Sequence, residues 1–283
     1  MSEKPIIALM YDFDHTLSPK DMQEYAFIPG LGIEAEDFWA ECAQTAKEHQ
    51  MDAILAYMFV MIEKARGKLL VTKDTLTALG KEVKLFPGVS TWFKRVNEYA
   101  ESKGLVCEHY ILSSGLKEII EGTSIAKEFK EIYAASFCYD KDGIPVWPAM
   151  AVNYTSKTQF MYRINKGVLD VTKDKELNEY MPDDMKRVPF RNMVYIGDGL
   201  TDVPCMKLAK ANGGYSVAVY QEKKKAANDM LKHGRVDYVA LTDYSKGSEM
   251  EKVIFELIDS MAATDVIVKR HLKHLSDAES ENI

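Results

Sequence analysis

Two pairs of aspartates follow apolar runs in the 283-residue sequence. Asp12 and Asp14 lie in YDFDHTLS, directly after the apolar run Ile6 to Met10, and Asp198 and Asp202 lie in GDGLTD, directly after MVYI. Four carboxylates that converge on one site repel one another and resist ionisation unless a cation lies among them. Because the donors are carboxylate oxygens with no histidine among them, they favour Mg²⁺ over Zn²⁺.

Two other interpretations of Asp12 and Asp14 are weaker. The spacing D-x-D-x-T also begins a calcium-binding loop, but Leu17 occupies the position of the loop glycine and Gln23 that of the bidentate glutamate. An isolated DFD would be a pair of turn or helix-cap residues in most proteins. The second aspartate pair, in GDGLTD, makes a shared site the better hypothesis.

A hydroxyl and an ammonium group complete a set of groups suited to phosphate. Ser113 follows the predicted strand HYIL, and Lys157 begins a predicted helix after NYTS, where both can hold phosphoryl oxygens. Ser114 competes with Ser113, and Lys166, at the other end of the same helix, competes with Lys157. The start of a helix presents free N–H groups and the positive end of its dipole, which favours Lys157. Together with a carboxylate nucleophile and a metal ion, these groups indicate phosphoryl transfer.

The pattern of apolar residues predicts the fold that would bring these groups together. Strands alternate with helices, which predicts right-handed βαβ crossovers and an α/β fold: a Rossmann-like, three-layer α/β/α core with a parallel sheet. Ligands bind such sheets at the carboxyl ends of the strands, where the polar clusters lie. A hairpin over residues 132–152, with a DKDG turn and several prolines, is predicted at an edge of the sheet.

A helical segment interrupts this core. From Asp21 to about Gly80 the sequence has helical patterns and no convincing strand. We predict a core domain formed by residues 1–18 and 86–283 and an inserted helical cap domain formed by residues 19–85. The last residues, SDAESENI, are predicted to be disordered.

Composition and charge limit the class of partner. The net charge of -7 argues against a nucleic-acid partner. The first apolar stretch is too short for a signal peptide, and the run Ala53 to Ile62 is too short to span a bilayer. The four cysteines are scattered, without the spacing of a zinc site or a disulfide framework. We therefore expect a cytoplasmic protein with reduced thiols and no membrane partner.

The polar clusters resemble, in order, the four motifs of the haloacid dehalogenase superfamily of aspartyl-nucleophile phosphatases. YDFDHTL resembles the first motif, DxDxT; ILSSG resembles the second, a lysine the third and GDGLTD the fourth. The resemblance implies that Asp12 attacks phosphorus to form an aspartyl-phosphate, and that Asp14 protonates the leaving alcohol and later activates water. It also implies that Asp12, the Asp14 carbonyl, Asp198 and Asp202 form the Mg²⁺ site. Ser113 and Lys157 would bind the phosphate, and Thr16, Ser114 and Gly115 would contact the substrate.

The inserted helical segment resembles the cap of the phosphoserine phosphatase-like branch. Such a cap closes over the site, excludes water and recognises the leaving group. Asp21 falls where phosphoserine phosphatases carry a glutamate that contacts the substrate amine, and Arg66 falls near their carboxylate-binding arginine. The alternative for Arg66 is that it stabilises the C-terminal end of the helix AILAYMFVMIEKA, where a cation is favoured by the dipole.

These observations favour a Mg²⁺-dependent phosphatase that acts on a small phosphorylated metabolite. A phosphomutase would use the same residues and return the phosphoryl group to a sugar, so only product analysis separates the two. A non-catalytic phosphate-binding protein would be expected to lack Asp12 or Asp14, and both are present. The sequence leaves the substrate open among phosphoserine, phosphocholine-like esters and sugar phosphates.

Overall fold

The computed structural model describes residues 4–280 of the chain. Within these residues, seven strands form a sheet in the order β4-β3-β2-β1-β5-β6-β7, so that β1 lies at its centre. Neighbouring strands are parallel except β3 and β4, which form the antiparallel hairpin predicted at the sheet edge. The strands are β1 (Ile6–Tyr11), β2 (Val106–Leu116), β3 (Glu131–Tyr139), β4 (Pro145–Met150), β5 (Met193–Gly197), β6 (Tyr215–Tyr220) and β7 (Tyr238–Leu241).

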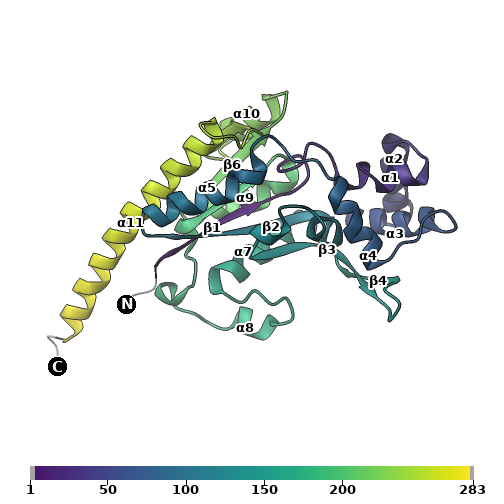
Figure 1. The fold of residues 1–283 in the computed structure, drawn as a ribbon. Coiled ribbons are helices and arrows are strands. Elements are labelled where there is room, and N and C mark those ends of the chain that lie inside the picture. The colour runs from purple at the N-terminus through teal and green to yellow at the C-terminus, as the bar shows by residue number, and fades with distance from the viewer. Residues whose placement is uncertain (1–3, 281–283) are drawn as a thin grey trace.

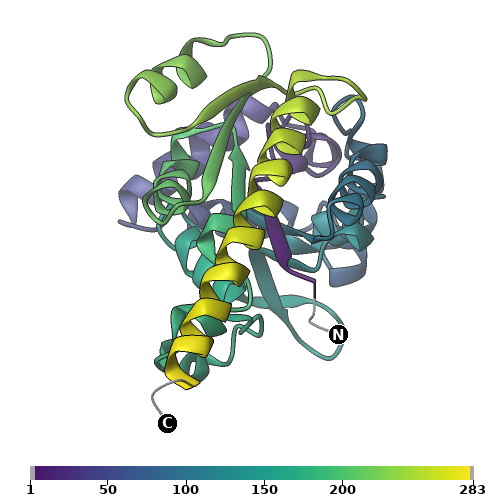
Figure 2. The same cartoon turned by 90° about the vertical axis from the view of Figure 1, so that its left-hand side faces the viewer.

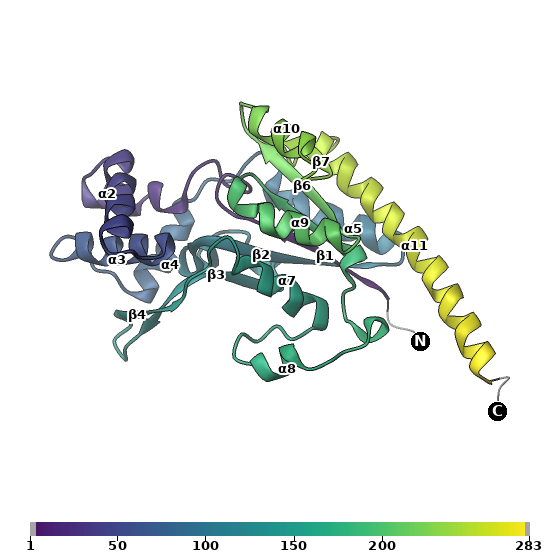
Figure 3. The same cartoon turned by 180° about the vertical axis from the view of Figure 1, so that it is seen from behind.

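Helices cover both faces of the sheet (Figure 1; Figure 3 shows the opposite side). Ile7, Leu9 and Tyr11 of β1 pack in one core layer, and Ala8 and Met10 pack in the other, as expected of a strand buried on both faces. The first layer includes residues of α5 (Val89–Ser102), α6 (Lys117–Glu121) and α11 (Glu249–Ser280); the second includes residues of α7 (Lys157–Lys166), α9 (Val203–Ala211) and α10 (Lys225–Lys232). The predicted three-layer α/β/α core is confirmed. The short helix α8 (Asp174–Asn178) lies in the connection from α7 to β5.

The helical segment predicted between β1 and α5 is present. Its helices are α1 (Phe27–Leu31), α2 (Ala35–Glu48), α3 (Ala53–Ala65) and α4 (Lys73–Leu79). They lie beyond the carboxyl end of β1, at one end of the sheet (Figure 1). The segment leaves and re-enters the core at neighbouring points, because the backbone N–H of Phe86 donates to the Leu17 carbonyl (2.9 Å). The division into a core and a separate cap domain of residues 19–85 stays a prediction.

The C-terminal end of the described chain is helical. Helix α11 has 32 residues and ends at Ser280, and its last turns project past the sheet (Figure 2). The predicted disorder is therefore wrong for residues 276–280, whereas residues 281–283 lie outside the described part of the chain. Once a helix has formed, each added residue gains a hydrogen bond, so the preceding turns can extend through a polar sequence. Among the described helices, none combines the length and the apolar character needed to cross a bilayer.

Candidate active site

Two aspartates lie at the carboxyl ends of neighbouring central strands. Asp12 follows β1 and Asp198 follows β5, and these strands pair in parallel. The backbone N–H of Asp12 donates to the Ile196 carbonyl (2.9 Å), which extends the ladder by one residue. Asp12, Asp198 and Asp202 each offer a carboxylate oxygen, and these oxygens all lie within 4.8 Å of one another. Such a group of oxygens fits a hard divalent cation.

Lys157 contacts these carboxylates and is only 1% exposed. Its Nζ donates to Oδ1 of Asp12 (3.0 Å) and to Oδ1 of Asp202 (2.7 Å). Burial opposes the charge of Lys157, but Asp12 and Asp202 outweigh it and hold the pKa of the ammonium group above its ordinary value. Lys166 lies elsewhere, because its Nζ donates to two backbone carbonyls in and after α8 (2.6 Å each). The structure thus brings Lys157, and not Lys166, to the carboxylates.

Asp202 is fully buried, and both of its oxygens accept hydrogen bonds. Oδ1 accepts from Lys157 and from the Tyr195 hydroxyl (2.7 Å), and Oδ2 accepts from the Gly199 N–H (3.2 Å). Glycine at position 197 leaves room for this carboxylate, because a Cβ there would lie 2.5 Å from Oδ2. Asp202 therefore holds Lys157 in place behind the two aspartates at the strand ends.

The Asp14 carboxyl group lines a cavity at the same sheet edge. Its Oδ1 accepts a hydrogen bond from the backbone N–H of Met22 (2.9 Å). Burial raises the pKa of Asp14 well above its ordinary value, and the negative charges of Asp21 and Asp12 raise it further. A raised pKa keeps the carboxyl group protonated to higher pH, as a general acid requires.

Burial also raises the pKa of Asp12 and Asp198, two further carboxyl groups that line the cavity. The pKa of Asp12 rises to about 6, although Lys157 opposes the rise. The pKa of Asp198 rises to about 7, because Asp12 and Asp202 add to the effect of burial. Such shifts are typical of carboxyl groups that are buried next to other carboxylates. A divalent cation would restore their ionised form, so the donor set fits the Mg²⁺ that the sequence predicts.

A bulge in β2 places three predicted residues at the cavity. The pairing of β2 with β3 shifts between Leu112 and Leu116, and Ser113, Ser114 and Gly115 lie within this shift and line the cavity. Ser113 Oγ accepts from the Gly115 N–H (3.0 Å). Ser114 Oγ is buried and has no hydrogen-bond partner among the described residues. A buried hydroxyl without a partner is suited to a ligand oxygen, so both serines stay candidates for phosphate binding.

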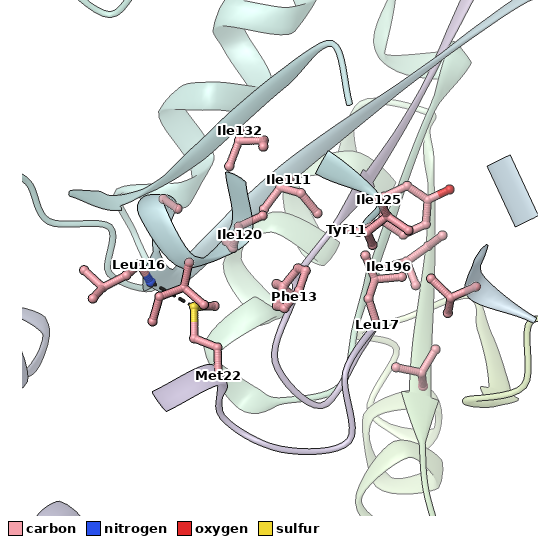
Figure 4. Packing of buried hydrophobic residues seen from close by; sticks show 14 of the residues in the cluster. Tyr11, Phe13, Leu17, Met22, Ile111, Leu116, Ile120, Ile125, Ile132 and Ile196 are labelled. Atoms are coloured by element: carbon pink, nitrogen blue, oxygen red, sulfur yellow. Dashed lines mark hydrogen bonds between the residues drawn. The ribbon is translucent and has the colours of Figure 1, made fainter. Parts of the chain in front are cut away.

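Met22 joins the start of the inserted segment to this bulge (Figure 4). Its Sδ accepts a hydrogen bond from the backbone N–H of Leu116 (3.2 Å), while its own N–H binds Asp14. A side chain at Gly115 would collide with the side chain of Met22. Met22 therefore fixes the loop after β1 against the end of β2, and nothing in the sequence distinguished it.

A cavity of about 340 Å³ lies between the core and the inserted segment. Eight predicted site residues line it: Asp12, Asp14, Asp21, Ser113, Ser114, Gly115, Lys157 and Asp198. The lining also includes Gln23, Trp39, Ile54, Tyr57 and Tyr154, which sequence reasoning missed. The apolar helix at residues 53–62 is the only signal for this group in the sequence, and Ile54 and Tyr57 belong to it.

Two predicted substrate contacts lie outside this lining. Thr16 is fully buried, and its carbonyl accepts from the Tyr244 hydroxyl (2.9 Å). Arg66 follows the last residue of α3, its side chain is 70% exposed, and it forms an ion pair with Glu63 (2.8 Å). Neither residue lines the cavity, although the buried Thr16 hydroxyl, like that of Ser114, has no hydrogen-bond partner among the described residues. The position of Arg66 favours the alternative role, that of a helix-end residue.

Arg66→Ala is therefore expected to change kcat/KM for phosphomonoesters by less than about twofold and to lower Tm slightly, because an exposed ion pair contributes about 0–1 kcal/mol. Steady-state kinetics and thermal denaturation of the purified variant measure both quantities. A tenfold or larger loss of kcat/KM at an unchanged Tm would indicate that Arg66 contacts the substrate.

Residues 9–207 match the family model of the haloacid dehalogenase-like hydrolases. The chain therefore belongs to this family of hydrolases. A relative, an uncharacterized protein of Borreliella burgdorferi, is 27% identical over 281 residues, which cover 89% of this chain and 96% of that one.

Solved structures share the fold. A HAD family hydrolase from Salmonella enterica serovar Typhi matches with a TM-score of 0.54 and 15% identity, over 90% of this chain and 72% of that one. A substrate-bound phosphoserine phosphatase matches with a TM-score of 0.52 and 15% identity, over 84% of this chain and 93% of that one. At such identities the similarity establishes the fold, and the chemistry must be argued from the site.

Proposed function

We propose that the protein is a Mg²⁺-dependent phosphatase that hydrolyses a small phosphomonoester through an aspartyl-phosphate intermediate. One observation carries the proposal: Asp12 contacts Lys157 (3.0 Å), offers an oxygen within 4.8 Å of those of Asp198 and Asp202, and shares a cavity with Asp14. A nucleophile, an acid and groups for phosphate and metal thus meet at one sheet edge. Membership of a hydrolase family supports the same conclusion.

The first half of the reaction joins the phosphoryl group to Asp12. A carboxylate oxygen of Asp12 forms a bond to phosphorus while the bond from phosphorus to the ester oxygen breaks. The carboxyl group of Asp14 gives its proton to that oxygen, and the alcohol leaves. Its raised pKa supports this role, because the proton is present before the ester bond breaks.

The second half returns Asp12 to its starting form. The Asp14 carboxylate, now deprotonated, takes a proton from a water molecule whose oxygen attacks phosphorus. The bond between phosphorus and Asp12 breaks, and inorganic phosphate leaves. Asp14 is then protonated again and ready for the next turnover.

The remaining groups hold the phosphoryl oxygens and the metal. Lys157 and the hydroxyls of Ser113 and Ser114 are suited to the oxygens. Asp12, Asp198 and the Asp14 carbonyl would hold Mg²⁺, with Asp202 close behind them. The ion would offset the negative charge of the phosphate and of the nucleophile.

A screen of phosphomonoesters with and without Mg²⁺ tests the proposal. We expect release of free phosphate that chelation of the metal abolishes and added Mg²⁺ restores. Calcium is expected to inhibit, because its larger and more flexible coordination would disturb the alignment of Asp12 with phosphorus. Full activity after exhaustive chelation would contradict the metal assignment, and formation of an isomeric sugar phosphate without free phosphate would indicate a mutase.

A further inference from the structure

The half of the cavity formed by the inserted segment has aromatic walls. Trp39 from α2 and Tyr57 from α3 lie edge to face, with ring centroids 6.1 Å apart and an interplanar angle of 75°. Both rings line the cavity, together with Tyr154 from the core. Trp39 Nε1 donates to Glu24 (2.9 Å) and the Tyr57 hydroxyl donates to the Ser114 carbonyl (2.8 Å). Because these polar atoms are bound within the protein, the two residues offer ring surface to a ligand.

The charges around the cavity favour a cation. Four carboxyl groups line it: Asp12, Asp14, Asp21 and Asp198. Asp14 carries a proton in the proposed mechanism, which leaves three carboxylates. Lys157 and His15 are the cationic groups among the described lining residues, and both are paired. Lys157 contacts Asp12 and Asp202, and His15 Nε2 lies 3.6 Å from Oδ2 of Asp21. A phosphate dianion and Mg²⁺ cancel in charge, so the surplus of negative charge remains when both are bound.

The same lining offers no free cationic partner for a carboxylate on the ligand. From the inserted segment it receives one carboxylate, an amide, an isoleucine and two aromatic rings, and no lysine or arginine. The amide is that of Gln23, which is 2% exposed and makes no hydrogen bond to any described residue through its side chain. Its oxygen can accept a hydrogen bond from an ammonium group. Arg66, with its exposed ion pair, lies outside the lining.

We infer that the leaving group is a small alcohol that carries an ammonium group and no carboxylate, held against the rings of Trp39, Tyr57 and Tyr154. The inference rests on the proposed phosphatase function. Aromatic rings attract cations through their negative faces, and a contact of this kind corresponds to roughly 2- to 30-fold in affinity. A cavity of about 340 Å³ has room for a phosphate and a short chain, since small-molecule sites begin at about 300 Å³.

Pairs of substrates that differ only in charge test the inference. We would measure kcat/KM of the full chain with Mg²⁺ for phosphocholine against neohexyl phosphate, its neutral isostere, and for phosphoethanolamine against propyl phosphate. For at least one pair, kcat/KM of the cationic ester is expected to exceed that of its neutral partner by about tenfold or more. Which pair shows this difference tells whether the site prefers a quaternary or a primary ammonium group. Phosphoserine is expected to be poorer than phosphoethanolamine. Equal rates within both pairs, or a preference for phosphoserine, would overturn the inference.

Variants test the ring and the charge separately through the ratio of kcat/KM between a cationic ester and its neutral partner. Trp39→Leu is expected to lower this ratio by roughly 3- to 30-fold, whereas Trp39→Phe, which keeps a ring, should retain most of it. Asp21→Asn should lower the ratio as well. Asp37→Asn, on an exposed position of α2 outside the lining, is the matched control and should keep the ratio. An unchanged ratio in Trp39→Leu would show that the aromatic wall does not recognise the cation and would overturn the inference.

Hydrolysis of para-nitrophenyl phosphate separates this inference from the proposed function. Activity on this ester that requires Asp12, combined with equal rates within both substrate pairs, would sustain the phosphatase and overturn only the cationic leaving group. No activity on any of these esters would overturn both.

Discussion

Asp12→Asn is expected to lower kcat for every phosphomonoester by at least roughly 10³-fold, because the amide keeps the shape of the side chain and loses its nucleophilic oxygen. The amide oxygen can still accept the hydrogen bond from Lys157, and the backbone bond to Ile196 does not involve the side chain. The fold should therefore be retained. Steady-state kinetics with para-nitrophenyl phosphate measures the loss.

The stability of this variant provides an independent check on the site. Burial raises the pKa of Asp12 to about 6, so the folded metal-free protein binds this proton more tightly than the unfolded chain. This proton binding contributes to the free energy of unfolding of the wild type, and the contribution is lost as pH rises through about 6. Asparagine is neutral at every pH, so the variant never carries a negative charge at this buried position. In metal-free protein at a pH above about 6, Tm of Asp12→Asn should equal or exceed that of the wild type.

Two further measurements decide what a loss of activity means. Asp184→Asn, at an exposed position between α8 and β5, is the matched control and should change neither kcat nor Tm. Acid-quenched wild-type protein should gain the mass of one phosphoryl group during turnover, and Asp12→Asn should not. Near-normal activity of Asp12→Asn, or a phosphoryl adduct in that variant, would contradict the assignment of the nucleophile.

The reactive groups could be predicted from the sequence because they follow short apolar runs. Asp12 and Asp198 come directly after runs that are fully buried in the structure, and parallel central strands bring such positions to one edge. The choice of Lys157 over Lys166 depended on the properties of a helix start, and the structure places Lys157 3.0 Å from Asp12. In each case a local sequence pattern was sufficient to predict the site residue once the sheet was predicted to be parallel.

The opposite wall of the cavity could not be predicted, because it depends on how the inserted helices pack. Trp39 and Tyr57 belong to different helices and meet only through the contact of α2 with α3. In the sequence, each is one of several apolar residues on its helix, and the face that reaches the cavity is decided by tertiary contacts. For Arg66 the sequence left two roles open, substrate contact and helix end, and the structure favours the second, because α3 ends there and the side chain is exposed.

Asp14→Asn is expected to separate substrates by their leaving groups. For an alkyl phosphate, whose alkoxide must be protonated as it leaves, kcat/KM should fall by about 10²- to 10⁴-fold. For para-nitrophenyl phosphate, kcat/KM should fall far less, because nitrophenolate leaves without a proton and kcat/KM reports the steps up to phosphoryl transfer. The asparagine oxygen can still accept the Met22 N–H that binds Asp14 Oδ1 at 2.9 Å, so the loop should keep its position.

The same variant should accumulate the aspartyl-phosphate, because its hydrolysis also needs Asp14, now as the base that activates water. Rapid mixing with para-nitrophenyl phosphate should then release a burst of nitrophenolate close to one equivalent of enzyme, followed by a slow steady state. Asp12→Asn is the comparison, since its kcat/KM should fall equally for the alkyl and the aryl ester and it should show no burst. If Asp14→Asn lost kcat/KM equally for the alkyl and the aryl ester, Asp14 would be a structural carboxyl group and another group would have to supply the proton.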